Sequence, residues 1–160
     1  MYRRIMVPLD GSKLAECVLP HVESVGGGCS AEEILLVTVT ERVPGYHLVQ
    51  DHYSDDVVRE RQVPEAVGKM DVQGQKYLDR IAKGLKAKGL NVKTEVLMGD
   101  PAGEITFKAE HGECDLIIMA SHGRTGPSRW AFGSVADKVF RASCVPVLMV
   151  RGPGCVANIK

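Results

Sequence analysis

Short apolar runs alternate along this chain with segments whose apolar positions recur every three or four residues. The runs are typical of buried strands, and the predicted strands are 3–9, 33–39, 90–98, 114–120 and 145–150. The fourth run, "CDLIIMA", is almost wholly apolar, as expected of a strand covered on both faces of a parallel sheet.

Helical spacing fills the gaps between these strands. The first predicted helix has Ser12 as its N-cap and is stopped by the glycines at 26–28. The second begins near Ala66, and its clearest stripe comprises Leu78, Ile81, Ala82 and Leu85. Gly89 is in position for its C-terminal cap.

Two further helices follow. One has Asp100 as its N-cap and Pro101 at its first position, and should run to about His111. The last begins at Gly133-Ser134. Strands alternating with helices predict the α/β class, with an open five-stranded parallel sheet covered by helices on both faces.

The domain prediction is a single unit over 1–151 with a short C-terminal tail, 152–160. Residues 40–65 carry scattered prolines and charges and no clear period. A loop of that length is unusual in a compact domain, so it either covers a site or is mobile.

Charge and composition limit the kinds of partner and the cell compartment that we expect. The 160 residues hold 20 basic and 20 acidic side chains, so no overall field favours nucleic acid or an anionic membrane. The first residues do not have the pattern expected of a signal peptide, and no apolar run is long enough to span a bilayer. Five cysteines without C-x-x-C spacing favour free thiols, and we expect a cytoplasmic protein.

The segment after the fourth strand is the strongest candidate for a ligand site. Glycines at 123, 126 and 133 would let a ligand approach the backbone, and Arg124 or Arg129 would offset negative charge. A helix beginning at Ser134 would direct unpaired N–H groups and a partial positive charge at a phosphate. Glycine-bearing loops and serine caps also occur without a ligand, so the spacing alone leaves both interpretations open.

Other sites have weaker support. The segment is neither a P-loop nor a dinucleotide fingerprint. His47 and His52 lie in the unpatterned segment, and no cluster has the spacing of metal ligands. No nucleophile elbow is present, and Asp10 lacks the acidic neighbour that a receiver domain needs. The lysines at 83–93 are not interleaved with aromatic residues, which argues against an RNA surface.

The stretch "SHGRTGPSRWAFGSVADKVFRASCVPVLMV" resembles the carboxyl-terminal signature of the universal stress protein family. In that signature a glycine, nine residues and a glycine followed by Ser or Thr come one after another, as Gly123, 124–132 and Gly133-Ser134 do here, while Ala120 replaces an earlier glycine. "RRIMVPLDGS", "VLMGDPAGEI" and "VPVLMV" resemble the family's first strand, its G-x-P element and its last strand. The resemblance implies an adenine-nucleotide α-hydrolase-like, Rossmann-type fold.

The family divides into members that bind ATP and members that do not, and the glycine signature marks the binding group. The resemblance therefore implies binding of ATP or another adenine nucleotide, with magnesium or manganese held mainly by the phosphates and by Asp10 through water. Thr38 would meet adenine through its backbone, and Met119 would pack on the ring. Without the family, Asp10 would be interpreted as a helix cap or Asx-turn before Ser12.

The implied nucleotide site is a set of sixteen residues. They come from four stretches, 8–11, 38, 119–126 and 133–135: Pro8, Leu9, Asp10, Gly11, Thr38, Met119, Ala120, Ser121, His122, Gly123, Arg124, Thr125, Gly126, Gly133, Ser134 and Val135. No residue is an obvious general base, so the expectation is a nucleotide-occupancy switch with at most slow ATP hydrolysis.

Two expectations concern assembly. The resemblance implies a homodimer paired antiparallel through the last strand, 145–150. The tail, 152–160, could instead cover that edge. The alternative function is a ligand-free interaction or dimerisation module with the same fold.

Overall fold

The computed structural model describes residues 2–40, 65–121 and 133–152, with the main chain alone for residues 65–70. Strands and helices alternate along the described chain. Their bounds are β1 (Arg4–Pro8), the 3-10 helix η1 (Ala15–Val18), α1 (Leu19–Gly28), β2 (Glu33–Thr40), α2 (Glu65–Lys86), β3 (Val92–Met98), α3 (Pro101–His111), β4 (Leu116–Ala120), α4 (Ser134–Ala142) and β5 (Val147–Val150).

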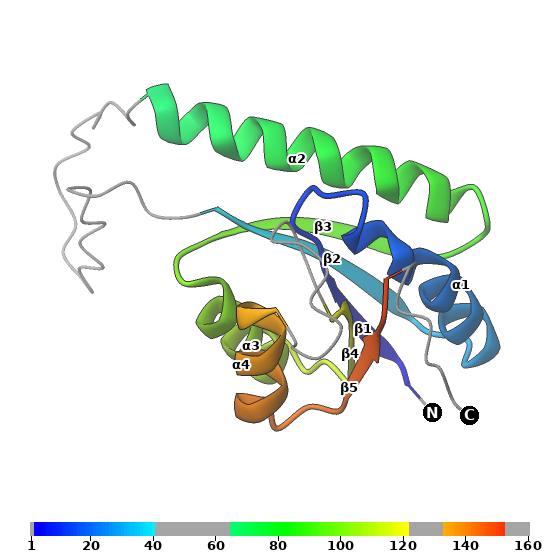
Figure 1. Cartoon of the computed structure of the whole chain (residues 1–160). Coiled ribbons are helices and arrows are strands. Elements are labelled where there is room, and N and C mark those ends of the chain that lie inside the picture. The colour runs from blue at the N-terminus through cyan, green and yellow to red at the C-terminus, as the bar shows by residue number, and fades with distance from the viewer. Residues whose placement is uncertain (1, 41–64, 122–132, 153–160) are drawn as a thin grey trace, which may run out of the picture.

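The five strands form one parallel sheet in the order β3-β2-β1-β4-β5. Two cores flank the sheet: one joins it to η1, α1 and α2, and the other joins it to α3 and α4. Figure 1 shows these two layers of helices on opposite faces. The predicted α/β class and parallel sheet are confirmed.

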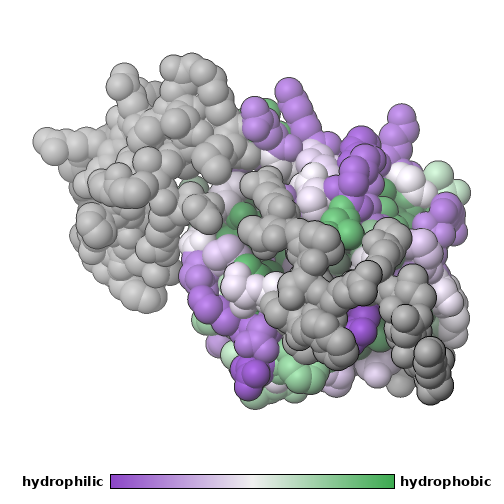
Figure 2. Space-filling model, viewed as in Figure 1, coloured by the Kyte–Doolittle hydropathy of each residue, from purple (hydrophilic) through white to green (hydrophobic). Residues whose placement is uncertain are grey.

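Helix α2 is the long amphipathic element of the first layer. Its inward stripe is the one that the spacing predicted, and all four of its residues are buried: Leu78, Ile81, Ala82 and Leu85. Hydrophilic side chains line its outer side, along the top of the molecule in Figure 2. The helix ends at Lys86, and Gly89 has a φ of +84°, the left-handed conformation expected near a helix end.

The first helix differs from its prediction at its start. The chain first forms the 3-10 turn η1, where the Ser12 hydroxyl accepts the Ala15 N–H, and α1 then ends at Gly28, the last of the three glycines at 26–28. Glycine disfavours a helix by about 1 kcal/mol but does not forbid it. A Cβ at Gly26 would lie 3.0 Å from Ile34 Cδ1, so glycine allows the close approach of α1 to β2 there. The reversal comes at Ser30, whose φ is +51°.

The third helix begins as predicted. The Asp100 side chain accepts a 2.9 Å hydrogen bond from the Gly103 N–H, and Pro101 occupies the first turn. Strands β3, β4 and β5 are each two residues shorter at their N-terminal ends than the apolar runs. Those extra positions form turns or connections. Within the unpatterned segment, 41–64 lies outside the described residues.

The topology determines where a ligand can bind. From β1 the chain moves to β2 and β3 on one side and later to β4 and β5 on the other, so the connections diverge between β1 and β4. In open parallel sheets such a switch point leaves a crevice outside the carboxyl ends of the strands.

Candidate functional site

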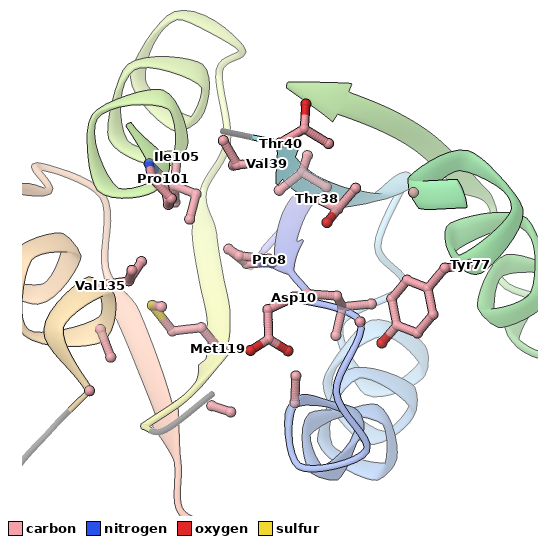
Figure 3. A pocket seen from close by; sticks show the side chains of 18 of the residues that line it. Pro8, Asp10, Thr38, Val39, Thr40, Tyr77, Pro101, Ile105, Met119 and Val135 are labelled. Atoms are coloured by element: carbon pink, nitrogen blue, oxygen red, sulfur yellow. The ribbon is translucent and has the colours of Figure 1, made fainter. Parts of the chain in front are cut away.

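A cavity of about 590 Å³ lies at the carboxyl ends of β1, β2 and β4. Its size is within the range of small-molecule sites. Figure 3 shows side chains converging on it from both helical layers. The lining residues are Pro8, Leu9, Asp10, Gly11, Ala15, Val37, Thr38, Val39, Thr40, Gln73, Gly74, Tyr77, Pro101, Ile105, Met119, Ala120, Gly133, Ser134, Val135 and Ala136.

The segment after β1 brings Asp10 to the middle of the cavity (Figure 3). Asp10 Oδ1 accepts hydrogen bonds from the Ser12 N–H at 2.9 Å and the Ser12 hydroxyl at 2.6 Å. The Ser12 hydroxyl oxygen in turn accepts the Ala15 N–H at 3.1 Å, where η1 begins. Asp10 therefore forms the Asx-turn that local sequence favours, and its carboxylate also lines the cavity.

The end of β2 directs successive main-chain groups to opposite sides of the strand. The Val37 carbonyl accepts the Leu9 N–H at 2.8 Å, toward β1, and the Thr40 carbonyl accepts the Gly99 N–H at 3.0 Å, after β3. Main-chain groups alternate sides along a strand, so those of Thr38 face β3 and those of Val39 face the β1 side. Since β1 ends at Pro8, the Val39 main chain faces the cavity edge beyond it, while Thr38 contributes its side chain to the lining.

Helix α4 starts at the cavity. Its first main-chain bond joins the Asp137 N–H to the Gly133 carbonyl at 2.9 Å, so the N–H groups of Ser134, Val135 and Ala136 have no acceptor within the helix. Gly133 is the N-cap and has no side chain to satisfy them. The Gly133 N–H is already donated to the Ser121 carbonyl at 2.7 Å.

At the end of β4, Met119 and Ala120 line the cavity, but Ser121 does not. Ser121 is 1% exposed, and its N–H donates to the Val150 carbonyl at 2.8 Å. Its main chain thus joins β4 to β5 and to the start of α4. Ser121 holds these elements together beside the cavity instead of lining it.

Five predicted site residues lie outside the described residues: His122, Gly123, Arg124, Thr125 and Gly126. The same is true of Arg129, His47 and His52.

Sequence reasoning missed the wall that α2 and α3 provide. Gln73, Gly74 and Tyr77 line the cavity from α2, and Pro101 and Ile105 line it from α3. Gly74 and Tyr77 are three positions apart, so they share one face of the helix. Nothing in their local pattern marks them as site residues.

The described residues favour neither a metal centre nor an activated thiol. No group of three His, Cys, Asp or Glu side chains is arranged there to hold a metal ion. The four described cysteines are free, and burial raises the pKa of the Cys17 and Cys114 thiols, which disfavours the reactive thiolate. None of the helices in the described part is long and apolar enough to cross a membrane.

Comparison with known proteins identifies the family. The model of the universal stress protein family matches residues 1–151. The chain belongs to this family. The universal stress protein MJ0577 of Methanocaldococcus jannaschii is 32% identical in an alignment that covers 94% of this chain and 96% of that relative. Its solved structure matches with a TM-score of 0.75 over 94% of this chain and 96% of that one.

More distant members share the fold of this universal stress protein. A universal stress protein solved in complex with cAMP is 18% identical, with a TM-score of 0.65 over 94% of this chain and 98% of that one. The Arabidopsis thaliana family protein At3g01520, solved with AMP bound, is 15% identical, with a TM-score of 0.63 over 95% of this chain and 93% of that one.

Proposed function

We propose that this universal stress protein binds adenine nucleotides, including ATP, and acts in the stress response as a nucleotide-occupancy switch. The observation that carries the proposal is one cavity that combines three features: the amides at the start of α4, the Asp10 carboxylate and the open main-chain edge of β2. Two family members of the same fold were solved with cAMP and with AMP, which supports the choice of ligand.

The start of α4 is suited to the phosphates. The amides of Ser134, Val135 and Ala136 precede the helical ladder, and the helix dipole adds about half a positive charge there. The Ser134 hydroxyl is a further donor. Because residue 133 is a glycine, no side chain at this position obstructs the approach of a phosphate to the amides of α4.

The adenine base, unlike the phosphates, needs apolar surroundings. Met119, Pro8 and Ile105 are apolar and line the cavity near the strand ends, where a flat ring can pack. The Val39 main chain carries one donor and one acceptor on the side where β1 has ended. An adenine edge with adjacent donor and acceptor groups matches that pair, so we place the base contact at Val39 instead of Thr38.

Asp10 is the residue suited to the sugar and to a metal ion. A carboxylate accepts hydrogen bonds from ribose hydroxyls and binds hydrated Mg²⁺ or Mn²⁺ through water. Such an ion would be held mainly by the phosphates, because Asp10 is the one acidic side chain among the described residues of the lining.

Hydrolysis is expected to be slow at most. The described part of the lining contains no histidine, lysine or arginine, and Asp10 already accepts two hydrogen bonds from Ser12. A general base must lie within hydrogen-bond reach of the proton that it removes. The site is therefore better suited to holding a nucleotide than to turning it over.

We further propose a homodimer that pairs through β5, which occupies one edge of the sheet. Leu148 is 37% exposed on this strand. Dimerisation without any ligand is the second candidate function, and the same edge supports it.

Two measurements distinguish nucleotide binding from ligand-free dimerisation: analysis of the ligand released on denaturation, and the thermal stability gained on adding nucleotide. Freshly purified protein is denatured and filtered, and the filtrate is analysed for adenine nucleotides by chromatography. Stripped protein is then heated with and without ATP, ADP or AMP. A nucleotide-binding protein gains thermal stability with ligand concentration. An empty filtrate together with an unchanged unfolding temperature would favour the ligand-free module.

A further inference from the structure

The outer main-chain edge of β3 has no hydrogen-bond partner among the described residues. β3 is the last strand of the sheet on the side opposite β5, and it lies next to α2 in Figure 1. The Asn91 carbonyl, just before β3, accepts the Ile34 N–H at 2.8 Å, so odd-numbered residues of this strand direct their main chain toward β2. By alternation, the N–H and C=O groups of Val92, Thr94 and Val96 face outward.

Helix α2 leaves this edge open. A groove of about 470 Å³ lies between the helix and the strand, and its lining residues are Asp71, Val72, Gln75, Thr94, Glu95 and Val96. Val72 is apolar and 52% exposed beside the groove. An incoming strand can therefore reach the middle of β3.

Two opposite charges lie on the same face of β3. Lys93 forms an ion pair with Glu33 of β2, and Lys108 of α3 forms one with Glu95 at 2.7 Å. Residues 93 and 95 are two positions apart in a strand, so both side chains project on the face that α3 covers. The side chains of Lys93 and Glu95 are 65% and 38% exposed, so both remain accessible from the edge.

A second copy of β3, paired antiparallel, fits these charges. When Thr94 faces the partner's Thr94, Val92 faces the partner's Val96, and such pairs exchange two main-chain hydrogen bonds each. Lys93 then faces the partner's Glu95, in a pair whose side chains lie close together. Sliding one strand by two residues keeps the hydrogen bonding but places Lys93 against the partner's Lys93, or Glu95 against the partner's Glu95.

We propose that β3 is a self-complementary interaction surface, through which two chains join about a two-fold axis at Thr94. The contact is isologous, and Lys93, already beside Glu33, gains the partner's Glu95 on its other side. Charged side chains on an edge strand discourage unselective pairing, and here they select one register. The contact is small, so it should form at roughly 100 μM and above, unlike the proposed β5 dimer.

Sedimentation equilibrium tests the proposal through the average mass, which should rise for the wild type between about 10 and 500 μM. Lys93→Glu and Glu95→Lys each bring like charges face to face in both symmetry-related pairs, so each should weaken this association roughly tenfold. An equimolar mixture of the two variants should regain it, because one chain carries carboxylates at both positions and the other carries ammonium groups. Lys13→Glu, at an exposed site near η1, should associate like the wild type.

The mixture separates pairing from folding. Each variant also loses an ion pair within its own chain, with Glu33 or with Lys108, and a mere loss of stability would persist in the mixture. A constant wild-type mass over the whole range would overturn the proposal, and so would a mixture that associates no better than its components. Single variants that associate as strongly as the wild type would assign the association to another surface and would also overturn it.

Discussion

Gly74 of α2 lies so close to Thr38 of β2 that a Cβ at position 74 would come within 3.0 Å of Thr38 Cγ2. Both residues line the cavity. Near this contact, the Thr40 hydroxyl donates to Asp71 Oδ1 at 3.0 Å and ties the same helix to the end of β2. The width of the cavity therefore depends on how closely α2 approaches the strand ends.

Gly74→Ala is expected to destabilise the fold and weaken ATP binding. The added methyl group overpacks against Thr38, a cost of about 1–3 kcal/mol that exceeds the gain of up to about 1 kcal/mol from alanine in a helix. The measurement is urea unfolding, followed by ATP titration of the folded variant.

Two controls accompany this substitution. Gly84→Ala lies on the same helix, where a Cβ meets nothing within 4 Å, and it should stabilise the protein by about 0.5–1 kcal/mol. Thr38→Ser removes Cγ2, so combining it with Gly74→Ala should restore part of the lost stability. A Gly74→Ala protein as stable as Gly84→Ala would contradict the close contact.

Ser134→Asp should separate folding from phosphate binding. A carboxylate in the first turn of α4 interacts favourably with the helix dipole, so stability should be maintained or rise by up to about 1 kcal/mol. The same charge lies where the phosphates are proposed and should reduce ATP affinity at least tenfold. Gly84→Asp adds an equal charge outside the cavity and should bind ATP like the wild type. Equal affinity of the two variants would exclude α4 as the phosphate site.

The β5 edge allows a test of dimerisation at one backbone group. The Pro146 and Val150 carbonyls accept hydrogen bonds from β4 and from Ser121, so by alternation the main chain of Met149 faces away from β4. Met149→Pro removes an outward N–H and should yield folded monomers, whereas Leu148→Pro removes an inward one and should destabilise the fold. Light scattering should give twice the 17.4 kDa chain mass for the wild type. A monomeric wild type at micromolar concentration would refute the dimer.

Asp115 should contribute stability that depends on pH. Its Oδ2 accepts the N–H groups of Arg4 and Arg3 at 2.8 Å each, and these bonds hold the pKa of its carboxyl below the usual value. A lowered pKa in the folded state means that the contribution is present above the unfolded pKa and is lost as pH falls through the folded one. The carboxylate is near the surface, so the contribution should be less than about 1 kcal/mol.

Asp115→Asn is therefore expected to lower the unfolding temperature at pH 7 and to have little effect at pH 2. Glu113→Gln, an exposed neighbour, should change neither value by much. A difference between Asp115→Asn and the wild type that is the same at both pH values would show that the carboxylate charge is not responsible.

Local signals predicted the parts of this molecule that depend on neighbours in the sequence. Asp100 and Pro101 start α3 because a capping carboxylate and a proline act within one turn, and Asp10 forms its turn with Ser12 for the same reason. The 3-10 turn η1 was not predicted, because apolar spacing alone does not distinguish a short 3-10 turn from the first turn of an α-helix.

The remaining site features depend on contacts between distant segments. Tyr77 and Gly74 reach the cavity only because α2 packs against β2 and β3, which no local pattern reveals. The proposed base contact at Val39 depends on where β1 ends beside β2 and on which carbonyls pair across the sheet. Ser121 directly follows the lining residues Met119 and Ala120, but its main chain hydrogen-bonds to β5 and to the start of α4.

Calorimetric titration of ligand-stripped protein with ATP, ADP and AMP tests the central claim most directly. We expect saturable binding heat with one site per chain for at least one of these nucleotides, and its loss in Ser134→Asp but not in Gly84→Asp. Absence of binding heat for all three at several temperatures, with the protein folded, would contradict it.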